Sequence, residues 1–460
     1  MRLPQIHLVQ DEFIYPRCNV NGATVEAYQT AMEGGAEFPP VEVQRVSGYG
    51  DEKEEAWLIL DGVHRWSAIG EGNEVEVVQW HEEVLDYEEN RWELLFRSYD
   101  LNAKNAKNLT NGDRKATLRR LSEDDENNVL SEEELGRRFG VDQKTISNWV
   151  GDIRARHDAS RDAIILRLSR LGWTQEAIGE KVDLDRSAVA KIVKNRSFPK
   201  IHNLVKQKGV SYTAQHYGLD VPLVWAIVGD EKDDQKLLED LSIKLRPYDV
   251  WNFPKCHDLF GRDHPGRIPG ELIAHVLYFF TERGDLVVDP MVGGGTTLDV
   301  ALVMGRKCFG YDIDNRHERS DIIEHDIFQQ GWPDATRKAA LIFWDPPYYK
   351  KKDKDYIEGS ISELSRDDYF EFFRARAIDI PKGFSGTLAF LCSDYIDEND
   401  PAESVFFWDY IEIFKDAGWI PEICIQAPLT SQQLVASQVV NLRDERKLAH
   451  LSRNLIIMRK

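Results

Sequence analysis

The chain is poor in cysteine, in long apolar runs and in net positive charge. Its five cysteines are scattered and form no Cys-x-x-Cys pair, so we expect a reducing cytoplasm and neither a metal site nor disulfides. No run approaches the roughly 20 apolar residues of a membrane span, and no signal-peptide pattern opens the chain. A net charge of −21 excludes a protein that coats nucleic acid by bulk attraction, so any such contact needs local basic patches.

The residues that organise the chain follow a short apolar run at 341–344, which indicates a strand. Asp345, Pro346 and Pro347 stop this strand abruptly. Because the prolines remove two backbone donors, we expect the carbonyls of Asp345 and Pro346 to stay unpaired at the carboxyl end of the strand, where open α/β sheets bind ligands. These acceptors suit an amino group, whose nitrogen lone pair they free for attack. Tyr348 adds a flat face on which an extruded base can stack.

A second pattern, upstream, predicts a cofactor site. Residues 285–289 indicate a buried strand, and a bend of three glycines follows, which lets the backbone approach a ligand closely. Thr296 or Thr297 is expected to cap the next helix. Residues 307–312 indicate a strand ending at Asp312, where an acid can hold ribose hydroxyls. The glycines match neither the dinucleotide fingerprint nor a P-loop, so NAD and ATP are not the expected ligands.

In this order, the segments resemble the S-adenosylmethionine-dependent DNA amino-methyltransferases, which modify adenine N6 or cytosine N4. The resemblance rests on Asp289-Pro-x-x-Gly-x-Gly-Thr-Thr, Gly310-Tyr311-Asp312 and Asp345-Pro-Pro-Tyr, and covers residues 248–460. It implies a doubly wound, Rossmann-like sheet of roughly seven strands, S-adenosylmethionine as cofactor and double-stranded DNA as partner. Its implied catalytic residues are Asp345, Pro346, Pro347 and Tyr348, and its implied cofactor-binding residues are Asp289, Pro290, Gly293, Gly295, Thr296, Thr297, Asp312, Asp326 and, before the bend, Pro269.

The resemblance also implies a mechanism. The target base is flipped out and stacked on Tyr348, while Asp345 and the Pro346 carbonyl accept its amino hydrogens. Asp-Pro-Pro-Tyr is found in both adenine and cytosine-N4 enzymes of this family, more often in the former, so adenine N6 is favoured. Residues 245–460 are the expected methyltransferase domain, preceded by a charged hinge. An RNA target is a lesser variant of the same interpretation.

Residues 1–92 form a first expected domain, a small α+β unit. A strand at 57–60 runs into Asp61-Gly-Val-His-Arg, so His64 and Arg65 open a helix after a glycine turn. Helix N-termini bind anions, which makes both residues candidates for holding a phosphate unless Arg65 pairs with a local carboxylate. Further strands are expected at 5–8 and 41–46 and a helix at 24–32.

With Tyr15-Pro-Arg17, the Asp61–Arg65 segment resembles the ParB/sulfiredoxin superfamily. Val63 stands where sulfiredoxin has its catalytic cysteine, which excludes that chemistry. The CTP-hydrolysing partition proteins have Glu-Arg-Arg where this chain has Val-His-Arg, so a nucleotide such as CTP at Arg17, His64 and Arg65 is left open. The alternative function is therefore a ParB-like, DNA-binding regulator or partition-type protein that binds CTP and has a non-catalytic methyltransferase domain. A ParB-like nuclease is disfavoured because no paired carboxylates stand at metal-ligand spacing in residues 1–90.

Residues 93–240 are expected to be all-helical and to repeat a helix-turn-helix pattern of small, turn and apolar residues. The three repeats are Gly136, Gly140, Ile146 and Trp149; Gly179, Asp183, Val189 and Ile192; and Ala214, Gly218, Val224 and Ile227. The first two recognition helices offer side chains that reach DNA, namely Gln143, Lys144, Thr145 and Asn148, and Arg186, Ser187, Lys191 and Lys194. The third, at 221–225, is nearly all apolar and is expected to be structural.

Local charge supports this interpretation, because residues 131–200 hold 14 Lys+Arg and 11 Asp+Glu in a chain with 58 and 79. A basic run beside the catalytic segment makes Lys350 and Lys351 candidates for phosphate contacts, or a solvated loop. No insert offers a separate target-recognition domain, so sequence choice is expected to rest on the helix-turn-helix array or to be weak. We expect a nucleoid-associated, cytoplasmic protein and leave a homodimer open.

Overall fold

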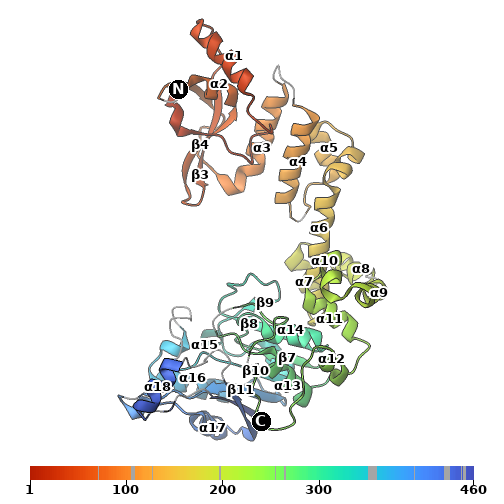
Figure 1. Ribbon diagram of the computed structural model, residues 1–460, viewed down its shortest axis with the longest axis vertical. Coiled ribbons are helices and arrows are strands. Elements are labelled where there is room, and N and C mark those ends of the chain that lie inside the picture. Colours follow the sequence, from red (N-terminus) through yellow and green to blue (C-terminus); the bar gives the residue numbers. More distant parts are fainter. Residues whose placement is uncertain are drawn as a thin grey trace. The chain divides into compact units, whose positions relative to one another are not determined.

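The computed structural model of the chain describes residues 1–70, 72–104, 109–126, 128–195, 198–253, 255–263, 266–350, 360–397, 399–428, 436–446, 448 and 452–460 (Figure 1). It divides into two compact units, Met1–Asp158 and Ala159–Lys460. The division falls inside one continuous helix, α6 (Gln143–Arg170). The three domains expected at 1–92, 93–240 and 245–460 stay a prediction. Among the described residues, no helix is both long and apolar enough to cross a membrane.

The first unit contains a six-stranded sheet of order β1-β5-β3-β4-β2, with β6 paired to β3. The bounds are β1 (Arg2–Pro4), β2 (Leu8–Val9), β3 (Val41–Tyr49), β4 (Glu54–Asp61), β5 (Glu74–Gln79) and β6 (Leu85–Asp86), with helices α1 (Gly22–Glu33), α2 (Val63–Ile69), α3 (Tyr87–Lys104), α4 (Asn111–Asp124) and α5 (Glu132–Phe139). The strand expected at 5–8 is wrong, because Gln5–His7 is a 3-10 turn. Pro4 ends β1 without a backbone donor, and the Gln5 carbonyl accepts the Trp66 indole N–H at 3.1 Å.

The predicted helix-turn-helix repeat is confirmed. The pairs are α5–α6, α7 (Gln175–Val182)–α8 (Arg186–Asn195) and α10 (Val210–Tyr217)–α11 (Val221–Gly229), with α9 (Phe198–Lys208) before the third. Each turn begins at a left-handed residue, with φ of 66° at Gly140, 53° at Asp183 and 62° at Gly218. The small residue four positions earlier is required by packing, because a Cβ on Gly179 would lie 2.3 Å from the Leu184 carbonyl oxygen.

The third pair is structural, as expected. On α11, Leu223, Val224 and Ile227 are buried in an apolar core of the second unit that also contains Leu298. The second helix of this pair therefore has no exposed face with which to enter a groove. Helix α12 (Asp234–Asp240) follows it and adds Leu237 and Leu238 to the same core.

The second unit is built on a seven-stranded sheet of order β12-β13-β11-β10-β7-β8-β9. The strands are β7 (Leu286–Asp289), β8 (Lys307–Asp312), β9 (Ile322–Glu324), β10 (Leu341–Trp344), β11 (Thr387–Ser393), β12 (Ile420–Pro428) and β13 (Ser452–Arg459). β13 pairs antiparallel with both β11 and β12, and the pairs among β11, β10, β7, β8 and β9 are parallel. The remaining helices are α13 (Gly270–Phe280), α14 (Thr296–Val303), α15 (Ile327–Gln330), α16 (Arg366–Ile378), α17 (Phe407–Asp416) and α18 (Ala436–Asp444).

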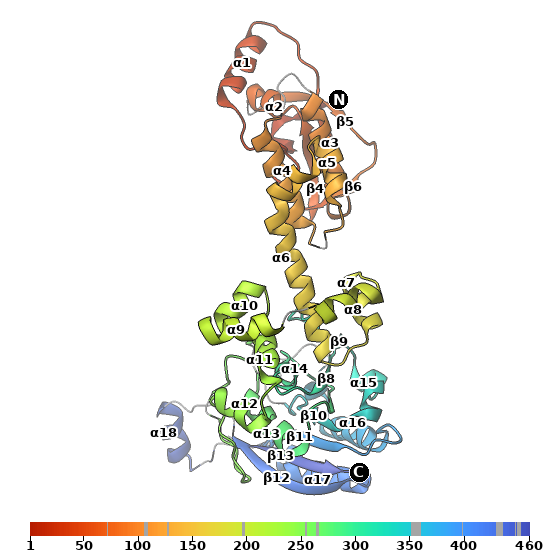
Figure 2. The same cartoon turned by 90° about the vertical axis from the view of Figure 1, so that its right-hand side faces the viewer.

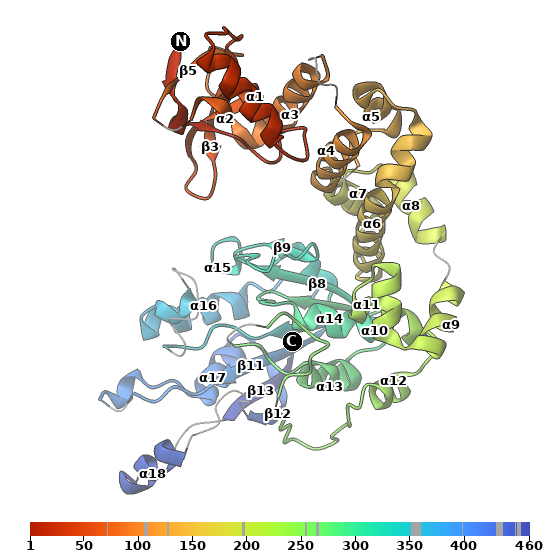
Figure 3. The same ribbon diagram turned by 45° about the horizontal axis from the view of Figure 1, so that its top comes forward.

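Alternate residues of the central strands enter two different cores, which confirms the doubly wound arrangement (Figure 3). Val287 and Phe343 pack with α11, α13 and α14, whereas Val288 and Trp344 pack with α16 and α17. Because both faces are covered, the exposed ends of the parallel strands are where a ligand can reach the sheet.

Candidate cofactor and catalytic site

Three acidic residues meet at the carboxyl ends of neighbouring strands. Asp289 ends β7, Asp312 ends β8, and Asp345 directly follows β10; β10 pairs in parallel with β7, and β7 with β8. Burial, together with the nearby carboxylates of Asp345 and Asp312, raises the pKa of Asp289 to about 7. Burial also raises the pKa of Asp312. Mutual repulsion of this kind requires that the three groups share one region of the sheet edge.

A direct contact joins the glycine bend to the Asp-Pro-Pro segment. The Trp344 indole N–H points at the Met291 sulfur, with 3.4 Å between Nε1 and Sδ. Trp344 is fully buried against Phe372, Phe373 and Phe390, so the end of β10 has a rigid base. The sequence hypothesis required Asp345 to lie beside the glycine bend, and it does.

The Asp-Pro-Pro-Tyr segment is held by two tyrosine hydroxyls. Tyr348 donates to Asp345 Oδ1 at 2.6 Å, and Tyr369 of α16 donates to the Pro347 carbonyl at 3.0 Å. No residue in the described part of the chain donates to the Pro346 carbonyl, which leaves this acceptor available as expected. The expectation of an open stacking face needs correction, because Tyr348 is only 9% exposed. Its hydroxyl turns the ring inward, onto the carboxylate of its own segment.

The glycine bend is fastened to both neighbouring strand ends. Gly293 N–H donates to Asp312 Oδ2 at 2.8 Å, and Val292 N–H to the Tyr311 carbonyl at 2.8 Å. The sequence suggested that Thr296 or Thr297 caps α14, but neither does. The N-cap is Gly295, which has φ of 81° and no side chain. The Thr297 hydroxyl instead donates to Asp289 Oδ2 at 2.6 Å, so this residue serves the buried acid.

Beneath the bend lies a buried network of arginines and aspartates. Arg319 donates to the Gly294 carbonyl at 3.1 Å and to Asp299 and Asp321 at 2.8 Å. Arg167, in α6, donates to Asp321 at 2.7 Å and also contacts Asp299. Burial alone would raise the pKa of Asp321, but the two guanidiniums outweigh it and hold that pKa below its usual range. The network therefore stays ionised and fixes the carbonyl side of the bend.

This network escaped the sequence analysis. Its partners are far apart in the chain, Arg167 and Asp321 by 154 positions, so no local spacing links them. One signal was present, because Asp299 is the only charged residue in the otherwise apolar helix 296–303. Such an acid needs a buried partner.

Pro269 and Asp326 are placed at the two ends of the site. Pro269 precedes α13, whose first residue, Gly270, packs so closely on Phe260 that a Cβ would lie 2.3 Å from the ring. Two residues after Phe260 the chain contacts the glycine bend, since Arg262 N–H donates to the Gly294 carbonyl at 2.9 Å. Asp326 follows β9, is half-buried and accepts the Phe328 N–H at 2.8 Å, which caps α15. Pro290, directly after Asp289, is buried in the bend itself.

The expected DNA-facing residues of the first recognition helix are mostly exposed. Gln143, Lys144 and Asn148 are exposed on the first turns of α6. Thr145 is partly buried, and its hydroxyl donates at 3.1 Å to Asp142 just before the helix. This helix therefore starts with a satisfied cap and three projecting polar side chains.

The second recognition helix is similar. Lys191 and Lys194 of α8 are exposed, whereas Arg186 pairs with Glu176 at 3.1 Å and Ser187 donates to Asp185 at 2.6 Å. These two partners hold the N-terminal side chains of α8 close to the turn.

The sequence also suggested that Lys350 and Lys351 contact phosphate, and Lys350 has a local partner. Lys350 pairs with Glu403 at 3.4 Å and lies 5.0 Å above the Tyr349 ring. Lys351 lies outside the described residues.

In the first unit, the expected anion ligands have partners of their own. Arg65 pairs with Asp61 at 2.7 Å, as the local-carboxylate interpretation required, and donates to the Pro39 carbonyl at 2.8 Å. His64 Nε2 accepts the Asn21 N–H at 3.1 Å, and Arg17 donates to Asn102 at 3.4 Å.

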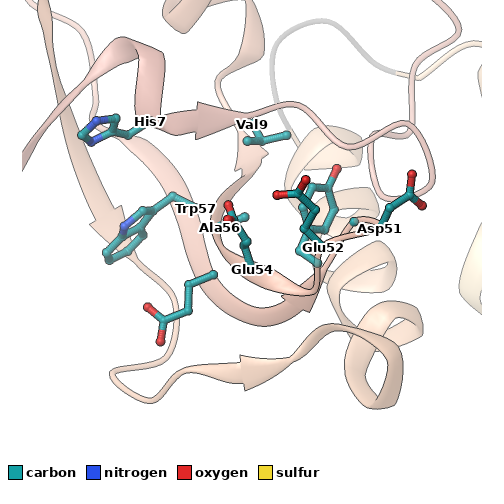
Figure 4. A pocket seen from close by; sticks show the side chains of 10 residues that line it. His7, Val9, Asp51, Glu52, Glu54, Ala56 and Trp57 are labelled. Carbon is teal, nitrogen blue, oxygen red and sulfur yellow. The ribbon is translucent and has the colours of Figure 1, made fainter.

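A cavity of about 590 Å³ lies elsewhere in this unit, against β2 and the β3–β4 turn (Figure 4). It is lined by Asp51, Glu52, Glu54 and Glu55, with His7 and Trp57. Arg17, His64 and Arg65 do not line it. Four carboxylates repel phosphate, so this cavity is not the nucleotide site that the sequence left open.

A match to a known protein family lies within the second unit. Residues 172–324 match the family model described as DNA methylase. The chain is 33% identical over 86 residues to DNA adenine methyltransferase YhdJ of Escherichia coli (strain K12), covering 17% of this chain and 29% of that protein. It is 30% identical over 101 residues to Type II methyltransferase M2.DpnII of Streptococcus pneumoniae, covering 21% and 38%. The chain thus spans about a third of the length of these curated relatives. The family match includes Asp289 and Asp312 and ends before Asp326 and Asp345.

Two solved structures show weak likenesses. A TehB-like SAM-dependent methyltransferase from Corynebacterium glutamicum gives a TM-score of 0.26 at 13% identity, covering 43% of this chain and 90% of that chain. The truncated chromosome-partitioning protein ParB from Caulobacter crescentus, complexed to the centromeric parS site, gives 0.22 at 15% identity, covering 49% and 96%. At these TM-scores neither likeness carries an argument.

Proposed function

We propose that the chain is a DNA methyltransferase that transfers a methyl group from S-adenosylmethionine to the exocyclic amino group of a flipped base, with adenine N6 favoured over cytosine N4. One observation carries the proposal. Asp345 and the unpaired Pro346 carbonyl stand at the end of β10, one strand away from the glycine bend that follows β7. An amino-group acceptor cluster and a cofactor bend are thus side by side at one sheet edge. The family match and the curated relatives support the same class of activity.

The residues present fit S-adenosylmethionine. The bend after β7, the acid after β8 and Asp326 after β9 follow one another along the sheet edge, as an extended adenosine requires. Gly293 has φ of 52° and is partly exposed, which brings bare backbone to the surface of the bend, whereas Gly295 is buried and faces Arg319. Asp312 uses Oδ2 to hold the bend, and its Oδ1, which accepts the Asp314 N–H at 3.3 Å, would also serve the ribose. When bound, the cofactor supplies an electrophilic methyl group.

The chain's own residues act on the amino group. Asp345 and the Pro346 carbonyl accept its two hydrogens, which directs the nitrogen lone pair away from the base plane and toward the cofactor side. Asp345 then takes the proton that the amino group must lose. Without a base, Tyr348 satisfies Asp345. Entry of a base exchanges this bond for the amino hydrogens and releases the Tyr348 ring to stack on the base, a contact worth roughly 1–3 kcal/mol.

The test is mass spectrometry of nucleosides from DNA of cells that express the chain, with cells expressing Asp345→Ala as control. We expect N6-methyladenine in the first sample and none above background in the second. N4-methylcytosine would reassign the base. If no methylated base forms although calorimetry shows that the protein binds S-adenosylmethionine, the proposed activity is wrong, and tight CTP binding would then support the regulator alternative.

A further inference from the structure

A 34-residue segment of this acidic chain has no acidic residue. Between Asp185 and Asp220 there are seven Lys+Arg and two His, and neither Asp nor Glu. At the chain's average of 79 acidic residues in 460, about six would be expected here. The segment extends beyond the second recognition helix, α8, through α9 and α10. Its charge is therefore not explained by a recognition helix alone.

Helix α9 presents its polar residues on one exposed face. Lys200, Asn203 and Lys206 are exposed, while Ile201 is buried in the core of the catalytic unit and Val205 packs partly against it. The spacing of three residues between them places the polar set on one side of the helix.

Helix α10 continues the polar surface after a turn at Gly209, whose φ is 85°. Its Gln215 is exposed, and its exposed Tyr212 stacks on exposed His216 with 6.1 Å between ring centroids and 11° between planes. Figure 2 shows α9, α10 and α11 next to one another. The surface of α9 and α10 is thus carried on a helix, α11, that is buried in the catalytic core.

The lysines of this segment have no compensating charges. Within the described residues, no carboxylate pairs with Lys191, Lys194, Lys200, Lys206 or Lys208. Other lysines of the same unit do pair, Lys232 with Asp240 at 2.8 Å and Lys350 with Glu403 at 3.4 Å. Unopposed cations in a chain of −21 create a local positive potential that attracts a polyanion.

We propose that the exposed face of α9 and α10 binds the phosphate backbone of duplex DNA that flanks the target base, an inference that rests on the proposed methyltransferase function. Lysines interspersed with Asn, Gln and Ser suit phosphate oxygens and carry no base specificity. A single-stranded partner would call for a series of aromatic platforms, and this face offers one stacked pair. Since α11 is fixed in the catalytic core, the surface holds the duplex while the flipped base occupies the site at Asp345.

The experiment compares two triple variants of the full chain. K200Q/K206Q/K208Q removes three charges from the proposed surface. K338Q/K382Q/K415Q removes three exposed lysines elsewhere on the same unit. Duplex affinity is measured by fluorescence anisotropy over a range of salt concentrations, and unfolding temperature and S-adenosylmethionine affinity report that each variant is intact.

We expect the first variant to lose at least tenfold in duplex affinity at moderate salt and its salt slope to fall by about 0.9 per lost phosphate contact. The second variant should match the parent in both quantities. An unchanged slope and affinity in a folded first variant would overturn the inference, as would tighter binding of single-stranded RNA than of duplex. A parent chain that binds duplex DNA but methylates none of it would count against the proposed function instead.

Discussion

At the scale of single residues, the state of Asp345 depends on its hydrogen bond from Tyr348. We predict that Asp345→Asn lowers kcat by at least about 100-fold, because the neutral amide cannot take the proton that the amino group must lose. Tyr348→Phe keeps the ring and loses a bond worth roughly 1.5–3 kcal/mol that an entering base must break, so KM for DNA should fall at least about tenfold while kcat stays within about twofold. Steady-state methyl transfer measures both.

Tyr349→Phe is the matched control, because this neighbouring hydroxyl donates to Glu403 and not to Asp345. It should keep kcat within about twofold. Equal KM values for DNA in Tyr348→Phe and Tyr349→Phe would mean that the bond to Asp345 has no special role.

The buried Asp289 makes stability depend on pH. Burial raises its pKa from 3.8 to about 7, so the folded state holds the proton more tightly than the unfolded chain. The stabilisation is fully present below pH 3.8 and is lost as the pH rises through 7, at about 1.4 kcal/mol per unit of pKa difference. Asp289→Asn should therefore flatten the free energy of unfolding across this window, measured by urea denaturation.

Thr297→Val is expected to act in the opposite sense. It deletes the donor that lowers the pKa of Asp289, so the loss of stability with rising pH should extend to higher pH than in the parent. If both variants keep the parent's pH dependence, another group is responsible for it.

At the scale of elements, the turn from β7 into α14 combines backbone strain with a close contact. Gly295 has φ of 81°, and a Cβ there would lie 2.4 Å from Arg319 Cζ. Gly284 has φ of 86° with nothing within 4 Å of a Cβ. Gly284→Ala should cost only the left-handed strain of about 1–2 kcal/mol. Gly295→Ala should also displace Arg319 and weaken S-adenosylmethionine binding at least about tenfold by calorimetry, since the bend is repositioned. Equal affinities in the two variants would contradict this.

Elements specified by nearby residues could be predicted from the sequence. The strands that end at Asp289, Asp312 and Trp344 were predicted from their apolar runs, and the three turns from small and left-handed residues at fixed spacing. Since parallel strands align their carboxyl ends, the meeting of Asp289 and Asp345 also followed.

What the sequence did not reveal depends on partners that no spacing specifies. Tyr348 is buried because its hydroxyl has an acceptor three residues away, yet the same sequence allows an exposed ring. Thr297 resembles a helix cap, but the buried Asp289 needs a donor more than the helix does. Arg167 and Arg319 meet Asp299 only after the chain has folded.

At the scale of the whole molecule, the second unit depends on residues upstream of the domain predicted at 245–460. Arg167 satisfies Asp299 and Asp321, and α11 fills the core against α14. Removing one partner of a buried ion pair costs roughly 3–5 kcal/mol. We therefore predict that a fragment of residues 159–460 unfolds cooperatively and binds S-adenosylmethionine, whereas residues 245–460 alone do not stay folded, as circular dichroism and calorimetry would report. A stable, cofactor-binding 245–460 fragment would contradict this.

The burial of α11 also limits how this protein can exchange parts with others. If a foreign specificity domain replaced the chain up to Asp240, α11 would be lost. The sheet would then lack the part of its core that α11 supplies. A productive crossover point lies instead within α6, upstream of Arg167, where the two compact units separate. A change of specificity should therefore keep the chain from Arg167 onward together with the sheet and vary only what lies upstream of it.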